Sequence, residues 1–347
     1  MRPRKQPPTE TQFIEKIQRI TCQSASQRRG VALSIGDDTA ALRIRSDRLL
    51  LVSCDAVVEG VHFDLNYFSP EDLGWKALAV NLSDIASMGG IPLYATTSIA
   101  LPMATPVGFV EKVYRGLAML AAQHRVALIG GDTCASRHGV FLDVTIIGEV
   151  HARRMVTRGG ARPGDLLYVT GELGGSAMGL ELLAGRSRLS RHISSMVRRH
   201  LRPQPRCAAG RFLAGQRLAS AMIDISDGLS TDLHHLCERS MVGAMIYSDR
   251  IPLPRVPSSQ INRFSSAPLS YALNGGEDYE LLFTVPQRLR RKVPRSIRGL
   301  PVHEIGHITS ETGVCWLCQG GRRSRLSPCG FDHFRDGHLT ASHRAIR

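Results

Sequence analysis

The stretch ALAVNLSDIASMGG at residues 77–90 decides the fold, because it places a carboxylate inside an otherwise apolar helix. The pattern predicts a helix from residue 70 to about residue 88, with Ser69 as its N-cap and a stop at Gly89. An unpaired carboxylate in such a helix is costly to bury. Asp84 therefore predicts that this helix borders a site that compensates its charge.

Further acidic clusters share this setting, each among glycine or small residues at the edge of an apolar run. They are Gly36-Asp37-Asp38, Cys54-Asp55, Gly130-Gly131-Asp132, Asp224-Ile225-Ser226-Asp227 and Gly275-Gly276-Glu277-Asp278. Any single member can be a polar turn or a helix cap. As a set they point to cations, because like charges at a core edge repel each other. Mg²⁺ bound by a few carboxylates and by phosphates is usual in ATP sites, so the set predicts a Mg²⁺–nucleotide enzyme.

A conventional phosphate loop is excluded, because the pattern Gly-x-x-x-x-Gly-Lys-Ser/Thr does not occur. The glycine-rich segment 171–179 either approaches a phosphate or forms a tight turn before a helix. Asp227 either belongs to the acidic set or caps the helix that follows it. Both alternatives stay open at the level of sequence.

Apolar runs and amphipathic stretches alternate in both halves, which predicts mixed strands and helices throughout. In the first half we expect strands at 40–45, 49–54, 93–100, 126–129 and 140–149, with helices at 12–20 and 107–123. In the second half we expect strands at 166–170, 220–225, 243–247, 281–285 and 302–307, with helices at 205–218 and 229–240. The Arg-, Gly- and Pro-containing stretch 153–165 predicts a domain junction.

The length of 347 residues predicts two domains. The net charge is +14, from 44 Lys and Arg against 30 Asp and Glu. This charge is scattered and aromatic residues make up 5%, which favours anionic small ligands over a nucleic-acid groove with stacking platforms. Eight widely spaced cysteines predict a reducing compartment, the cytoplasm. Cys315 and Cys318 form a tight pair, but the second pair of ligands that zinc binding needs is missing. No apolar run is long enough for a membrane helix.

Several motifs together closely resemble the thiamine-monophosphate kinase family. Its superfamily also includes aminoimidazole ribonucleotide synthetase, selenophosphate synthetase and a carboxamide-dehydrating hydrogenase-maturation protein. The motifs occur in family order and cover nearly the whole chain from residue 12 to 334. They are GDDTA at 36–40, VEGVHF at 58–63, ALAVNLSDIASMGG at 77–90, GGDT at 130–133, RGGARPGD at 158–165, DISDGL at 224–229, GGEDYELLFTV at 275–285, IGHIT at 305–309 and GFDHF at 330–334.

The resemblance implies a two-domain aminoimidazole ribonucleotide synthetase-like fold, α/β and α+β. The N-terminal α/β domain, 12–150, would pair with its copy in a homodimer, and the C-terminal α+β domain would span 151–334. Residues 1–11 and 335–347 would be flexible ends. ATP would lie between the domains, and the implied reaction is the ATP-dependent phosphorylation of thiamine monophosphate to thiamine diphosphate with several Mg²⁺ ions.

The resemblance also implies roles for particular residues. Mg²⁺ would be bound at Asp38, Cys54, Asp55, Asp84, Asp132, Asp224 and Asp227, with Asp84, Asp132 and Asp227 in the catalytic role. The nucleotide would contact Gly131, Asp132, Arg158 and Ser226, and thiamine monophosphate would contact His62, Glu277 and Phe331. Taken singly, each of the last three has an ordinary alternative: a hydrogen-bonded structural histidine, a turn residue and a core phenylalanine.

The chain departs from the family at Cys54, where the family usually has threonine. A thiol is a poor ligand for Mg²⁺, so a side-chain ligand here would be weakened, whereas a backbone ligand would not. Cys54 motivates one hypothesis beside the kinase, an inactive homologue. The shared superfamily motivates a second, a carboxamide-dehydrating enzyme, and the net positive charge a third, a basic nucleic-acid-binding protein. The dehydrating relative ends in a cysteine and this sequence ends in Arg347, while nucleic-acid binding leaves the acidic clusters unexplained.

Overall fold

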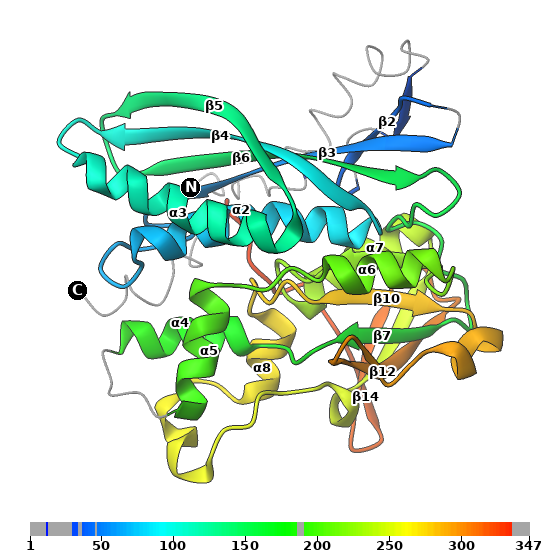
Figure 1. The fold of residues 1–347 in the computed structure, drawn as a ribbon. Helices are drawn as coiled ribbons and strands as arrows, with labels where there is room; N and C mark the ends of the chain where they lie inside the picture. The colour runs from blue at the N-terminus through cyan, green and yellow to red at the C-terminus, as the bar shows by residue number, and fades with distance from the viewer. Residues whose placement is uncertain (1–11, 13–29, 34–36, 46, 186–190, 335–347) are drawn as a thin grey trace, which may run out of the picture.

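The computed structural model describes residues 12, 30–33, 37–45, 47–185 and 191–334. They form two sheets stacked one above the other, with helices between and around them (Figure 1). The helix expected at 12–20 lies outside the described residues except for its first position, and so do the expected flexible ends. Among the described helices, none is both long and apolar enough to cross a membrane.

The first sheet has six strands in the order β1-β2-β3-β6-β4-β5. Neighbouring strands run antiparallel, except that β4 and β5 are parallel. The strands are β1 (Val31–Leu33), β2 (Ala40–Arg43), β3 (Arg48–Val58), β4 (Ile91–Pro102), β5 (Ala127–Ser136) and β6 (Phe141–His151).

Two of these strands run further than the apolar pattern predicts. β3 continues through Asp55, which pairs with Val144, and β5 continues through Asp132, which pairs with Ser98. The expectation that these aspartates follow strand ends is therefore wrong. Ladder hydrogen bonds are made by the backbone, so pairing continues where the side chains become polar.

Helices α2 (Pro70–Ser87) and α3 (Val107–His124) cover the face of this sheet that is turned toward the second sheet (Figure 1). The predicted N-cap is confirmed, since the Asp72 amide donates to Ser69 Oγ over 3.1 Å. The two helices approach backbone to backbone at Gly74, where a Cβ atom would lie 1.9 Å from the Val113 carbonyl oxygen. This contact holds α2 as the layer between the two sheets.

The second sheet has the order β14-β13-β9-β12-β7-β10-β8, with β11 paired to β12. It is also mixed, with β9 and β13 as its parallel pair. Its strands are β7 (Leu166–Thr170), β8 (Ala221–Asp224), β9 (Gly243–Tyr247), β10 (Leu281–Val285), β11 (Ser296–Ile297), β12 (Leu300–Thr309), β13 (Cys315–Gln319) and β14 (Arg322–Arg325). The helices of this half are α4 (Gly175–Ala184), α5 (Arg191–Leu201), α6 (Cys207–Gly215), α7 (Leu229–Ser240) and α8 (Pro268–Asn274), with short 3-10 turns at Ser248–Arg250, Ser258–Arg263 and Gln287–Lys292.

The fold is thus a two-domain arrangement with two mixed sheets, as expected. Helix α6 joins the halves, because it packs so closely on α2 that a Cβ atom at Gly210 would lie 1.9 Å from the Ala86 carbonyl oxygen. Helix α5 and the short helix α8 were not expected from the sequence. The exact domain bounds, 12–150 and 151–334, stay a prediction.

The Cys315-x-x-Cys318 pair does not converge into a metal site. Both residues lie in β13, where side chains three positions apart point to opposite faces. Cys315 is buried and its sulfur lies 3.8 Å from the sulfur of Cys237 on α7.

Candidate active site

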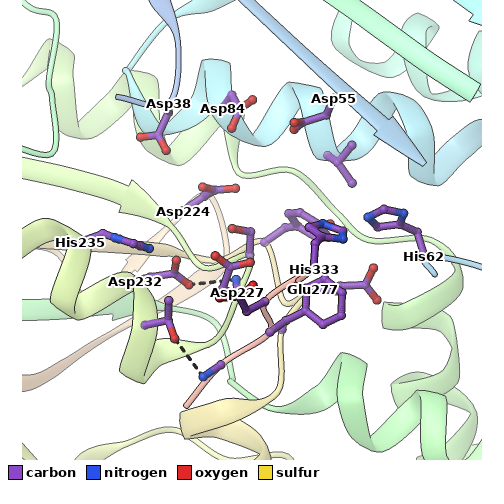
Figure 2. Close-up of a pocket in the computed structure, with 18 of the residues that line it drawn as sticks. Asp38, Asp55, His62, Asp84, Asp224, Asp227, Asp232, His235, Glu277 and His333 are labelled. Atoms are coloured by element: carbon purple, nitrogen blue, oxygen red, sulfur yellow. Dashed lines mark hydrogen bonds between the residues drawn. The ribbon is translucent and has the colours of Figure 1, made fainter. Parts of the chain in front are cut away.

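A cavity of about 1300 Å³ opens between the two domains. Its first wall is formed by β3, α2 and the segment before β2, and its second by the turn after β8, helix α7, the 276–279 loop and residues 330–333. Figure 2 shows the carboxylates of the two walls facing each other across this space.

Three aspartates form the centre of the site, two of them buried and Asp84 half-buried. One carboxylate oxygen from each of Asp38, Asp84 and Asp224 lies within 4.8 Å of the other two. Burial, together with repulsion from neighbouring aspartates, raises the pKa of Asp84 well above its usual range and that of Asp224 to about 7. Asp38 Oδ2 is buried and has no hydrogen-bond partner among the described residues. Hard carboxylate oxygens gathered at one point are the ligand set that Mg²⁺ prefers, so these residues fit the predicted ion.

Asp55 extends this cluster along β3. Its charge adds to the repulsion that raises the pKa of Asp84. Asn81 fixes the Asp55 backbone, since Asn81 Oδ1 accepts from the Asp55 amide over 3.0 Å and Asn81 Nδ2 donates to the Asp55 carbonyl over 3.3 Å. The Ser53 hydroxyl donates to Asp84. Asn81 was not among the predicted site residues, although a buried amide three positions before Asp84 was a usable signal.

The turn after β8 brings in Asp227 from the opposite wall. Asp227 does not cap α7, as one alternative held; Gly228 is at that position, and Asp232 Oδ2 accepts from the amides of Asp227 and Gly228 over 3.2 and 3.1 Å (Figure 2). Asp232 is buried, and burial and the charges of Asp227 and Asp224 raise its pKa well above the usual range. Asp232 was missed because a carboxylate in the first turn of a helix reads as an ordinary favourable charge.

Arg158 lines the cavity between the domains. Its Nε donates to Asp38 Oδ1 over 3.1 Å, and its backbone amide donates to Asp37 Oδ2 over 3.2 Å. Ser226 also lines the cavity, but β8 ends at Asp224, so Ser226 lies in the turn and does not continue the strand alternation. Both residues therefore line the space between the two domains.

The far end of the cavity is lined by aromatic rings. His62 Nδ1 accepts from the Val58 amide over 3.0 Å, and burial lowers the pKa of His62 to about 4, so the ring is neutral. The His333 ring lies 4.9 Å from the His62 ring and 4.6 Å from the Phe331 ring, measured between centroids. The Phe331 amide donates to the Asp227 carbonyl over 3.1 Å, which links this end to the acidic turn. His62 is thus both a hydrogen-bonded structural residue and a cavity wall.

Glu277 lies at the same end and is held by two buried partners, one lysine and one histidine. Its Oε1 lies 2.6 Å from Lys76 Nζ and its Oε2 lies 3.1 Å from His200 Nδ1. Burial acts to raise the pKa of Glu277, but Lys76 and His200 outweigh it and hold the pKa below its usual range. Neither Lys76 nor His200 was predicted from the sequence.

Three predicted site residues do not join the cluster within this chain. Strand alternation places the Asp132 side chain and the Cys54 thiol on the sheet face turned away from α2, where the thiol donates to Asp143 Oδ2 over 3.0 Å. Gly131 is needed for strand contact, because a Cβ atom there would lie 1.9 Å from the Thr97 carbonyl oxygen. The predicted roles of Asp132 and Gly131 are therefore not explained by one copy of the chain, whereas Cys54 still lines the cavity and could act there only through its backbone.

Asp278 decides between the two alternatives for the glycine-rich segment 171–179, which were a phosphate contact and a tight turn before a helix. Its carboxylate accepts from the amides of Gly174 and Ser176 over 2.5 and 3.2 Å, at the start of α4. Those amides are occupied by a protein carboxylate, so the segment is a turn before a helix. Burial raises the pKa of Asp278 to about 7.

Comparison with known proteins gives the family. Residues 36–150 match the N-terminal domain, and residues 162–315 the C-terminal domain, of the AIR synthase related proteins. The chain is 40% identical over 314 residues to thiamine-monophosphate kinase of Escherichia coli K12, covering 89% of this chain and 94% of that protein. It is 36% identical over 311 residues to the enzyme of the same name from Bacillus subtilis 168, covering 88% and 94%.

A solved structure, AaThiL complexed with AMPPCP and TMP, agrees with this result. It superposes with a TM-score of 0.80 at 35% identity, covering 94% of this chain and 97% of the other. The resemblance stated from the motifs is confirmed. The chain belongs to the thiamine-monophosphate kinase family of AIR synthase related proteins.

Proposed function

We propose that this protein transfers the γ-phosphate of ATP directly to the phosphate of thiamine monophosphate, giving thiamine diphosphate and ADP in a Mg²⁺-dependent step. The kinase activity is that of the family to which the chain belongs. The observation that carries the detailed proposal is the convergence of Asp38, Asp84 and Asp224 in the cavity between the domains.

The chemistry requires two polyanions to approach each other. Mg²⁺, when bound, would screen their repulsion and stabilise charge on the transferred group. Asp38, Asp55, Asp84, Asp224 and Asp227 would hold these ions. A phosphate oxygen is already ionised at neutral pH, so the acceptor needs orientation and no strong general base.

Arg158 would take part in binding the nucleotide phosphates. In the structure its guanidinium pairs with Asp38. A cation bound at Asp38 would take over that pairing and leave the planar donors of Arg158 for a phosphate, with Ser226 close by in the turn after β8. The acceptor ring would lie at the far end, against His62, Phe331 and Glu277, with its phosphate toward the aspartates.

Asp132 and Gly131 would act in a homodimer. Both lie in β5, at the end of the strand order in the first sheet, and Asp132 points to the face that α2 and α3 leave uncovered. A second copy placed on this face would enclose them, which supports the predicted pairing of N-terminal domains. A cytoplasmic location stays a prediction from the cysteine pattern.

The test is a chromatographic assay of purified protein with ATP, Mg²⁺ and thiamine monophosphate. We expect thiamine diphosphate and ADP in equal amounts, no product with EDTA, and no diphosphate when unphosphorylated thiamine replaces the acceptor. ATP hydrolysis without thiamine diphosphate would refute the proposed acceptor. If the protein is inactive and Cys54→Thr restores activity, the inactive-homologue hypothesis holds instead.

A further inference from the structure

We propose that Lys76 and His200 are positioning residues, which fix the Glu277 carboxylate so that it receives an amino-bearing heteroaromatic ring at the acceptor end of the cavity. The inference rests on the proposed function, in which Glu277 contacts the acceptor. It assigns the orientation of the Glu277 carboxylate to Lys76 and His200, for which the motifs implied no role.

Lys76 lies on α2, two turns before Asp84, and its side chain is completely buried. Its ammonium group lies 2.6 Å from Glu277 Oε1 and donates to the His62 carbonyl oxygen over 2.7 Å. It also lies 5.2 Å from the centroid of the Phe68 ring. One lysine thus ties together the two acceptor-end residues, His62 from the first domain and Glu277 from the second.

His200 holds the other carboxylate oxygen from α5. Its Nδ1 lies 3.1 Å from Glu277 Oε2 and 3.1 Å from Ser176 Oγ, and the Phe68 ring packs edge-on at 5.5 Å between centroids. Burial and the charge of Lys76 lower the pKa of His200. An ionised carboxylate only accepts hydrogen bonds, so His200 donates to Glu277 through Nδ1–H. Each oxygen of the Glu277 carboxylate is therefore held by one partner, Lys76 from α2 and His200 from α5.

The backbone of Glu277 shows the same constraint. Its φ angle is +67°, a conformation that non-glycine residues adopt rarely, and its amide donates to the Ser226 carbonyl over 2.7 Å. Such backbone strain persists only where the surroundings enforce it, and it gathers at binding sites.

The stability of the fold alone does not explain the buried ion pair between Lys76 and Glu277. A buried ion pair replaced by apolar residues of similar volume is often neutral or stabilising, because desolvation offsets the attraction between the charges. Each carboxylate oxygen can accept two hydrogen bonds, so Lys76 and His200 leave one position on each oxygen for a ligand. A fixed, ionised carboxylate with two open acceptor positions suits a ring that carries an exocyclic amino group.

The experiment compares Lys76→Met with Lys112→Met, a matched change at an exposed lysine of α3. Hydrogen bonds to charged groups contribute roughly 1.5–3 kcal/mol, so Lys76→Met should raise the KM for thiamine monophosphate by about tenfold or more. The kcat at saturating acceptor and the KM for ATP should stay within about threefold of wild type. Lys112→Met should change none of them. His200→Asn keeps a donor at the Nδ1 position, so its KM for thiamine monophosphate should stay close to wild type. His200→Leu removes that donor, so its KM should rise.

A double variant, Lys76→Met/Glu277→Gln, separates positioning from folding, because it leaves no unpaired buried charge. If Lys76 acts through Glu277, the double variant binds thiamine monophosphate as weakly as Glu277→Gln alone in calorimetric titration. Additive losses, or equal losses for ATP and acceptor, would overturn the inference. A wild-type protein that binds thiamine monophosphate without phosphorylating it would refute the proposed function, whereas the titrations would still decide the role of Lys76.

Discussion

At the scale of single residues, Asp84 carries a charge that a metal ion would compensate. Burial, followed by repulsion from Asp55, Asp224 and Asp38, raises its pKa, and the Ser53 hydroxyl donates to it. Asp84→Asn removes a repelled charge, so we expect the metal-free protein to be at least as stable as wild type. Phosphoryl transfer should fall by about 100-fold or more, since charge stabilisation is the main catalytic contribution in this chemistry.

The measurement pairs the product assay with thermal denaturation in EDTA and in Mg²⁺. The exposed Asp47→Asn serves as the control and should leave both unchanged. Near-normal turnover in Asp84→Asn would show that the metal site lies elsewhere.

The pH dependence of stability is a second prediction at this scale. The pKa of Asp224 is raised to about 7, whereas its unfolded value is near 3.8, so between these values the folded state binds more protons. Its contribution to the free energy of unfolding therefore falls as the pH rises from about 4 to about 7. In EDTA, Asp224→Asn should gain stability relative to wild type across this window, and Mg²⁺ should remove the difference. Denaturant titrations at four pH values test this, and a gain that shrinks as the pH rises would contradict it.

The site residues that the sequence revealed share one property: a charge in an apolar or glycine-rich context. Asp38, Asp84 and Asp224 were found this way, and the structure gathers them. Lys76 and Asp232 were not found, because each is compatible with an ordinary helix. Lys76 acquires its meaning from Glu277, which is distant in sequence, and Asp232 from the shape of the turn before α7, whose amides at Asp227 and Gly228 it accepts from.

At the scale of elements, periodicity located most helices and strands, including α7, β9 and β10 at their observed bounds. It failed at strand ends. β3 and β5 extend through Asp55 and Asp132 because backbone pairing with β6 and β4 continues there, which no single-strand pattern contains. Helix α5 was missed for a related reason: its segment is strongly basic and lacks the apolar run that the other helices show.

The packing of α2 on α3 gives a prediction for stability. A Cβ atom at Gly74 would lie 1.9 Å from the Val113 carbonyl oxygen, and backbone cannot move aside cheaply. Gly74→Ala should therefore lower the free energy of unfolding by about 3 kcal/mol, at the upper end of overpacking costs. Gly108→Ala on α3 is the matched control, because its Cβ atom would meet nothing within 4 Å, and it should change stability by less than about 1 kcal/mol. Chemical denaturation measures both, and equal effects would show that the helices do not pack as described.

At the scale of the whole molecule, the domain arrangement followed from the order of the motifs, but the position of Asp132 did not. The structure places Asp132 on the face of the first sheet that α2 and α3 leave uncovered among the described residues, away from the cavity aspartates. A sequence pattern cannot say which copy of a chain completes a site. The disagreement between the implied role of Asp132 and its position is itself the strongest argument for a dimer.

The uncovered face of the first sheet predicts the assembly. It exposes Tyr94 by 45% and Phe141 by 39%, both on the side turned away from α2. Exposed apolar groups that share a sheet face mark an interaction surface, and a two-fold axis would let this face cover itself. We expect the wild type to sediment as a dimer and Tyr94→Asp as a folded monomer, whereas Met241→Asp, at an exposed position of the second domain, should stay dimeric. If Asp132 acts across the interface, the monomer should lose phosphoryl transfer while still binding thiamine monophosphate. A fully active monomer would instead place the whole reaction within one chain.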